Sequence, residues 1–230
     1  MTLLPRWLHR GYDAATQPIA RSLTVAGINP NVITTVGTGI LLASGVAFAF
    51  GQVRWGGALL LLSGVCDTLD GKVARSSGRV SAFGAFYDST LDRIGESALF
   101  AGIAIYFLQG GVPGALAVVA VFTAVVALAA GLIVSYARAR AEGLGLECKV
   151  GLAQRAERIL GLGAPTMFFG AGPDGKLLLA IVALLALMAA VTVVQRMMHV
   201  YRITRQGPDD VRAAQARPAL VESAGKGLNR

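Results

Sequence analysis

Long apolar runs recur along the chain, each close to the roughly 20 residues that a helix needs to cross the hydrocarbon core of a bilayer. Measured against that length, the sequence predicts six membrane-spanning helices, at about residues 31–51, 55–76, 81–108, 115–140, 150–171 and 177–203. Residues 110–114 read GGVPG and separate the third span from the fourth, as helix breakers do. We therefore expect an all-α integral membrane protein with one membrane domain over residues 1–205.

A helix of a different kind is predicted before the first span, over residues 1–28. Apolar residues recur there at helical spacing opposite a polar stripe, and they are Leu4, Leu8, Tyr12, Ala15, Ile19 and Leu23. This pattern is typical of an amphipathic helix that lies in the membrane interface, with Pro18 as the place for a kink. Residues 206–230 show little apolar periodicity, so we expect a disordered cytoplasmic tail there.

Composition and charge agree with a membrane location. Hydrophobic residues make up 54% of the chain, charged residues 15%, and the mean hydropathy is +0.61. A formal net charge of +8 would suggest nucleic acid as the partner of a soluble protein, but here the cations flank apolar spans, so we expect no nucleic-acid partner. With a cytoplasmic N-terminus, only Arg54 and Lys176 lie in outside loops. We therefore expect both termini and the ionisable clusters on the cytoplasmic side of a prokaryotic plasma membrane.

Four aspartates lie where the second span ends and the third begins. Asp67 and Asp70 belong to the second span, and Asp88 and Asp92 to the third. Residues three or four apart share one helical face, so the two pairs can converge across a hairpin. Carboxylates at membrane depth are costly enough to indicate function, and hard oxygen ligands select Mg²⁺, Mn²⁺ or Ca²⁺. Four carboxylates suit two metal ions about 3.5 to 4 Å apart that bridge a phosphate.

The aspartates belong to a longer motif. Residues 67–92 read DTLDGKVARSSGRVSAFGAFYDSTLD, which fits the pattern DxxDGxxAR(x8)GxxxDxxxD. Its fixed positions are Asp67, Asp70, Gly71, Ala74, Arg75, Gly84, Asp88 and Asp92. This motif resembles the signature of the CDP-alcohol phosphotransferase family. The resemblance implies a membrane enzyme with six transmembrane helices, usually a homodimer, which moves the phosphatidyl group of CDP-diacylglycerol to an alcohol and releases CMP.

The resemblance also assigns roles to matching residues. It implies two Mg²⁺ ions, with Mn²⁺ as an alternative, held by Asp67, Asp70, Asp88 and Asp92. Asp92 would in addition be the base that deprotonates the acceptor hydroxyl. The positions that would contact the CDP-lipid are Asn31, Val32, Ile33, Thr34, Gly71, Arg75 and Ser81.

A second cationic cluster bears on the acceptor. Arginines at the ends of the fourth, fifth and sixth spans would suit an alcohol that itself carries a phosphate. The stretches SYARARAE at 135–142, QRAER at 154–158 and VQR at 194–196 are similar to those of phosphatidylinositol phosphate synthases. That similarity implies inositol 1-phosphate as the acceptor, with its phosphate bound by Arg138, Arg155, Arg158 and Arg196.

Two alternatives stay open from the sequence. The same arginines could serve glycerol 3-phosphate, and the aspartates could be a cation site in a transporter. Glu96 extends the stripe of Asp88 and Asp92 by another turn of helix, and we expect it to pair with Arg93 in the same helix rather than to act as a fifth metal ligand.

Overall fold

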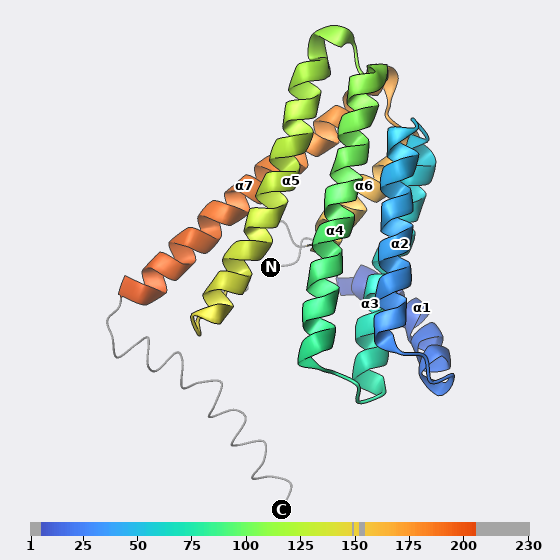
Figure 1. Ribbon diagram of the computed structural model, residues 1–230, viewed down its shortest axis with the longest axis vertical. Helices are drawn as coiled ribbons and strands as arrows, with labels where there is room; N and C mark the ends of the chain where they lie inside the picture. Colours follow the sequence, from blue (N-terminus) through green and yellow to red (C-terminus); the bar gives the residue numbers. More distant parts are fainter. Residues whose placement is uncertain (1–5, 149, 152–154, 206–230) are drawn as a thin grey trace, which may run out of the picture.

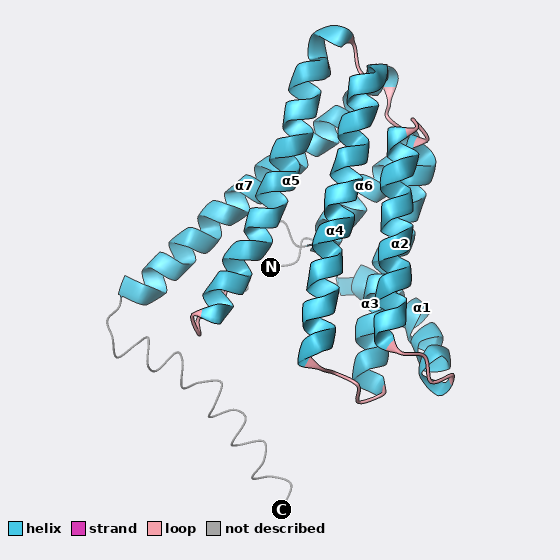
Figure 2. Ribbon diagram, in the orientation of Figure 1, coloured by secondary structure: helices cyan, strands magenta, loops and turns pink. Residues whose placement is uncertain are grey.

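The computed structural model describes residues 6–148, 150–151 and 155–205, and this part of the chain holds helices and no strand (Figures 1 and 2). The elements are α1 (Arg6–Val25), α2 (Pro30–Ala49), α3 (Val53–Ser76), α4 (Ala82–Tyr106), the π-helical turn η1 (Phe107–Gly111), α5 (Gly114–Gly143), α6 (Arg155–Phe169), the 3₁₀ turn η2 (Pro173–Gly175) and α7 (Lys176–Arg205). The all-α prediction is therefore confirmed. The predicted tail at 206–230 lies outside the described residues.

Helices α2 to α7 follow the predicted ranges in order. Within the described residues, three helical stretches are long and apolar enough to cross a membrane, namely Pro30–Ala49, Gly114–Gly143 and Pro173–Arg205. These stretches are consistent with a membrane protein. Helices α3 and α4 owe their lower hydropathy to the aspartates and arginines within them, and α6, at 15 residues, is shorter than the predicted range of 150–171.

Local sequence signals explain where the helices begin and turn. Asn29 caps α2, because its side-chain oxygen accepts a hydrogen bond from the backbone N–H of Asn31. Ser81 caps α4 in the same way, through the N–H of Gly84. Between α3 and α4, Gly78 has a φ of +67°, a conformation that glycine adopts without steric cost. The turn therefore reverses the chain, and α2 packs against both of the aspartate-bearing helices.

The helices form two groups, with α2, α3, α4 and α6 in one and α5 and α7 in the other (Figure 1). Helix α2 packs against both α3 and α4, while α5 packs against α7 and α4, and α6 packs against α3. The core between them is apolar, and its largest fully buried side chains include Phe48, Phe107, Leu60, Ile103, Leu162 and Leu178. Helix α1 lies beside α3 near the α3–α4 turn and continues through Pro18.

Helices α2 and α4 approach each other at glycines. A Cβ atom added to Gly45 would lie 2.5 Å from the carbonyl oxygen of Ala98, and one added to Gly102 would meet the carbonyl oxygen of Gly45. Small residues of this kind let helix backbones approach closely within membranes. The close contact holds α4, and with it Asp88 and Asp92, against α2.

We predict that Gly45→Ala destabilises the protein by about 1–3 kcal/mol, because the added methyl group has to push the α4 backbone away. Thermal denaturation of the purified protein in detergent would measure the loss. Gly39→Ala is the matched control on the same helix, since a Cβ there meets nothing within 4 Å. Equal melting temperatures for the two variants would contradict the prediction.

Candidate active site

The end of α3, the beginning of α4 and the beginning of α6 surround a polar pocket. Its lining includes all four predicted aspartates together with an arginine from α6, and in full it consists of Thr34, Gly37, Thr38, Leu41, Ser63, Asp67, Asp70, Asp88, Asp92 and Arg155. The hairpin thus brings the two aspartate pairs together, as the spacing along α3 and α4 predicted. Thr34, Thr38 and Ser63 add hydroxyl groups from α2 and α3 that the motif alone did not indicate.

Three of the carboxylates are close enough to share a cation. One oxygen from each of Asp67, Asp70 and Asp88 lies within 4.8 Å of the others. Asp70 accepts a hydrogen bond of 2.8 Å from the Thr34 hydroxyl, whereas Asp88 Oδ1 is buried and has no hydrogen-bond partner. A buried carboxylate oxygen without a partner is costly, and hard oxygen donors are what Mg²⁺, Mn²⁺ and Ca²⁺ prefer. The residues present therefore fit a divalent metal ion.

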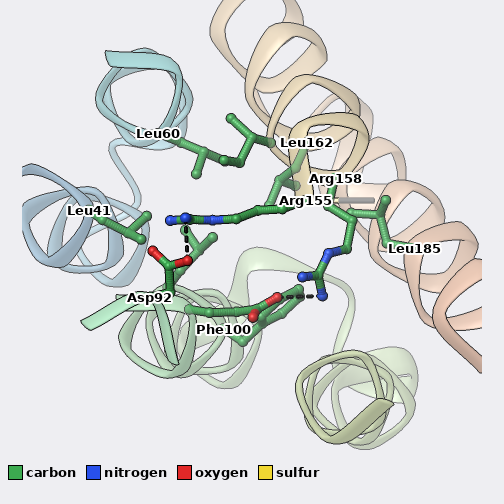
Figure 3. A pocket seen from close by; sticks show the side chains of 11 residues that line it. Leu41, Leu60, Asp92, Phe100, Arg155, Arg158, Leu162 and Leu185 are labelled. Atoms are coloured by element: carbon green, nitrogen blue, oxygen red, sulfur yellow. Dashed lines mark ion pairs between the residues drawn. The ribbon is translucent and has the colours of Figure 1, made fainter. Parts of the chain in front are cut away.

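Asp92 has a different environment from the other three. It is buried, it lies 3.3 Å from the guanidinium of Arg93, and it forms an ion pair with Arg155. The guanidinium of Arg155 also forms an ion pair with Asp67, so one cation joins the two aspartate-bearing helices. Figure 3 shows Arg155 reaching across from α6 to Asp92.

A second pocket continues from the first and shares Asp92, Arg155 and Leu41 with it. It is lined mainly by apolar side chains such as Leu60, Leu162 and Leu185, but it also holds a second ion pair (Figure 3). Glu96 and Arg158 are 2.6 Å apart, and their side chains are only 13% and 11% exposed.

This pair corrects one prediction. Glu96 was expected to pair with Arg93, but Arg93 instead contacts Asp92 and donates a hydrogen bond to the Ser135 hydroxyl of α5. The physical reason is that α6 packs against α3 and brings Arg158 over α4 from a distant part of the sequence. A buried carboxylate requires a charged partner. Packing of α6 provides Arg158 as the partner of Glu96, in place of Arg93 from the same helix.

Of the residues expected at the CDP-lipid, Thr34 lines the aspartate pocket, and four others lie in two local contacts. The Arg75 guanidinium lies over Gly71, 3.2 Å from where a Cβ would be. A Cβ on Gly84 would meet the Ser81 hydroxyl at 3.1 Å and the Asn31 side-chain oxygen at 3.5 Å, so these two polar groups are neighbours.

Two residues of the expected α2 segment point elsewhere. Ile33 is buried in an apolar cluster with Leu69 and Val73 of α3, and Val32 is 54% exposed. Thr34 is the member of this segment that contacts an aspartate directly.

Two of the four arginines expected at the acceptor line these two pockets, and the other two lie outside their lining. Arg155 and Arg158 line the pocket beside Asp92. Arg138 is half-exposed and pairs with Glu142 one turn further along α5, at 2.8 Å. Arg196 is buried and donates hydrogen bonds to the carbonyl oxygens of Val150 and Val134.

Comparison with known proteins identifies the family. The sequence profile of the CDP-alcohol phosphatidyltransferases matches residues 27–204, which include the whole aspartate motif. The chain belongs to the CDP-alcohol phosphatidyltransferase family. Membership of a transferase family favours group-transfer chemistry over the transporter alternative.

Two similar proteins in this family are named as synthases of inositol phosphate lipids. The phosphatidylinositol phosphate synthase of Cutibacterium acnes is 41% identical over 204 residues, covering 84% of this chain and 95% of that protein. The archaetidylinositol phosphate synthase of Methanothermobacter thermautotrophicus is 42% identical over 170 residues, covering 74% of this chain and 82% of that protein.

The fold also matches a solved structure. The phosphatidylinositol phosphate synthase of Mycobacterium tuberculosis with CDP-DAG bound superposes with a TM-score of 0.70 at 32% identity, over 81% of this chain and 93% of that one. The same enzyme has also been solved in complex with manganese and citrate. That manganese complex and the aspartate cluster of this chain both point to a divalent-metal site.

We predict that Glu96→Gln destabilises the protein by about 3 kcal/mol, because it leaves the buried Arg158 guanidinium without a counter-charge. Glu142→Gln is the control, since it breaks the half-exposed pair with Arg138 and should change stability by less than about 1 kcal/mol. Denaturation curves of both variants test this. A Glu96→Gln protein as stable as the control would show that the pair contributes nothing.

Proposed function

We propose that the protein transfers the phosphatidyl group of CDP-diacylglycerol to inositol 1-phosphate, which yields phosphatidylinositol phosphate and CMP. The observation that carries this proposal is the convergence of the motif aspartates with Arg155 in one pocket of a CDP-alcohol phosphatidyltransferase. The names of the relatives support inositol phosphate as the acceptor, and the bound ligand of the M. tuberculosis enzyme supports the donor.

The metal site in this proposal holds two Mg²⁺ ions, with Mn²⁺ as an alternative. Asp67, Asp70 and Asp88 are the ligands that the geometry supports, and Asp92 completes the family set. Bound divalent ions would neutralise the charge of the diphosphate and of the leaving CMP. Thr34 contributes by holding the Asp70 carboxylate in place.

Asp92 is the proposed base. Its carboxylate takes the proton of the acceptor hydroxyl, whose oxygen then bonds to the lipid-linked phosphorus as the bond from that phosphorus to CMP breaks. The ion pairs with Arg93 and Arg155 orient the carboxylate before the acceptor arrives. Burial keeps water from competing with the hydroxyl.

The donor and the acceptor occupy opposite sides of the aspartates in this proposal. The CDP-lipid contacts the edge formed by Asn31, Val32, Ile33, Thr34, Gly71, Arg75 and Ser81. The acceptor phosphate is bound from the other side by Arg138, Arg155, Arg158 and Arg196. The ion pair of Arg158 with Glu96 supports a further task for that residue, namely holding α6 at the depth at which Arg155 reaches Asp92.

We further propose the membrane arrangement. Helices α2 to α7 span a prokaryotic plasma membrane, and residues 1–28 lie in its cytoplasmic interface. Outward apolar side chains such as Val118, Phe122 and Leu187 support contact with lipid, and the excess of cations at the aspartate end supports a cytoplasmic active site. Two chains would pair as a homodimer, as the family resemblance implies.

Release of CMP tests the reaction. We predict that the purified protein, given CDP-diacylglycerol and Mg²⁺, releases CMP with inositol 1-phosphate and not with glycerol 3-phosphate, myo-inositol or serine. Chelation of the metal should abolish the signal. Asp92→Asn should lower kcat by about 10²- to 10⁴-fold, because it removes the base.

Other outcomes of the same assay would change the acceptor, the role of Asp92 or the reaction that we propose. CMP release with glycerol 3-phosphate alone would keep the chemistry and overturn the acceptor. Full activity in the Asp92→Asn protein would overturn the role of Asp92, and silence with every alcohol would overturn the transferase reaction itself.

The acceptor arginines make a second prediction. Arg138→Gln should raise KM for inositol 1-phosphate by about tenfold or more and leave KM for CDP-diacylglycerol unchanged, because a charge-assisted hydrogen bond to the acceptor phosphate is lost. Arg140→Gln is the matched control, two residues along the same helix and outside the proposed set. Equal KM values for the two variants would remove Arg138 from the site.

A further inference from the structure

Helix α3 has a second polar face beside the one that carries the aspartates. Thr68, Lys72 and Ser76 recur every four residues and therefore line up along one side of the helix. Thr68 and Lys72 occupy variable positions of the DxxDGxxAR motif and Ser76 follows directly after it, so the motif does not explain them. Each forms a side-chain hydrogen bond to α1.

The bonds follow one another along the two helices. The Tyr12 hydroxyl donates to the Thr68 hydroxyl at 3.0 Å, and the hydroxyls of Thr24 and Ser76 are 2.8 Å apart. Beyond α3, the Arg79 guanidinium donates to the carbonyl oxygen of Gly27 at 3.0 Å. We refer to this series, together with the Lys72 contacts described next, as the α1–α3 ladder.

Lys72 forms the central rung. Its ammonium donates to Asp13 Oδ1 at 2.7 Å and to the Thr16 hydroxyl at 2.6 Å. The Lys72 side chain is only 15% exposed and Thr16 is buried, so the bond between these two is shielded from water, whereas the Asp13 side chain is 66% exposed. A long flexible lysine held at two points has lost most of its freedom to move, and it therefore restrains the helix to which it is attached.

The same side of α1 supplies an apolar contact. Ala20 is 3% exposed and packs in a cluster with Ile33, Leu69 and Val73. The opposite side of α1 is open, since Ile19 is 48% exposed. Leu23, one turn after Ala20, also packs against this cluster, so α1 binds α3 through one face that is both polar and apolar.

The ladder lies next to the metal ligands. Thr68 follows Asp67 directly, and Leu69 and Lys72 flank Asp70. Asp70 is fixed on its other side by the Thr34 hydroxyl of α2. The rotation of α3 about its own axis, which determines where both carboxylates point, is therefore restrained from α1 and from α2.

We infer that α1 is a strut that fixes the rotation of α3, and that Lys72 is a positioning residue for the metal ligands Asp67 and Asp70. The inference rests on the metal role proposed above for these aspartates. Metal–ligand distances must hold to about 0.2 Å, so a small rotation of α3 is enough to weaken the site. Lys72 acts through the helix and touches neither metal nor substrate.

Mn²⁺ binding to the full-length purified protein tests the inference directly, by calorimetry or by the loss of the free-ion EPR signal. Lys72→Met should raise the Mn²⁺ Kd by about three- to tenfold, and the metal concentration for half-maximal CMP release should rise with it. KM for CDP-diacylglycerol at saturating metal should stay at the wild-type value, and Lys72→Arg should recover part of the affinity.

Lys176→Met is the matched control. It also breaks a lysine–aspartate pair, with Asp174 at 3.0 Å, but it lies at the end of α7 opposite the aspartates and should leave Mn²⁺ binding unchanged. A double-mutant cycle with Asp13→Ala gives a second measurement with milder variants. Since Asp13 and Lys72 share an ion pair, their effects on the Mn²⁺ Kd should be less than additive.

Several results would overturn the inference. Unchanged Mn²⁺ affinity in a folded Lys72→Met protein would do so, and so would strict additivity in the cycle. A raised KM for CDP-diacylglycerol with normal Mn²⁺ affinity would place Lys72 at the substrate instead. A wild-type protein that binds no Mn²⁺ would contradict the metal site itself, a failure that the wild-type measurement distinguishes from a failure of the strut.

Discussion

Mutual repulsion among four carboxylates at the α3–α4 hairpin is the constraint on which the rest of the structure depends. Each negative charge removed from water requires compensation, and inside a helical membrane protein few groups can supply it. Here Arg155 pairs with Asp67 and Asp92, Arg93 with Asp92, and the Thr34 hydroxyl with Asp70. Asp88 Oδ1 is buried without a hydrogen-bond partner, and a divalent cation at the aspartate cluster would satisfy it.

The compensating groups come from different helices, so their positions have to be held by packing. The glycine contact between α2 and α4 brings the Asp88 and Asp92 helix against the helix that supplies Thr34. Helix α6 packs on α3 and delivers Arg155 to the aspartates, and the pair of Glu96 and Arg158 ties α6 to α4. Helix α1 holds α3 from the remaining side through the ladder.

This arrangement gives the pocket two chemically distinct sides. Thr34, Thr38 and Ser63 line it with hydroxyl groups from α2 and α3, and Arg155 presents its charge from α6. Asp92 lies where the aspartate pocket meets the second, largely apolar pocket. Asp92, buried and paired with Arg93 and Arg155, is therefore the carboxylate that both pockets share.

The sequence by itself determined the helices and the aspartate pairs, because apolar length, glycine breakers and the spacing of three or four residues are local properties of the chain. It also indicated the family, since the motif lies within 26 residues of one hairpin. Only the tertiary structure decided the partners of the charges. Glu96 had Arg93 within reach on its own helix, yet packing of α6 brought Arg158, and Lys72 found Asp13 and Thr16 on a helix far earlier in the chain. Such choices depend on which helices touch and at what depth, and the local pattern carries no information about either.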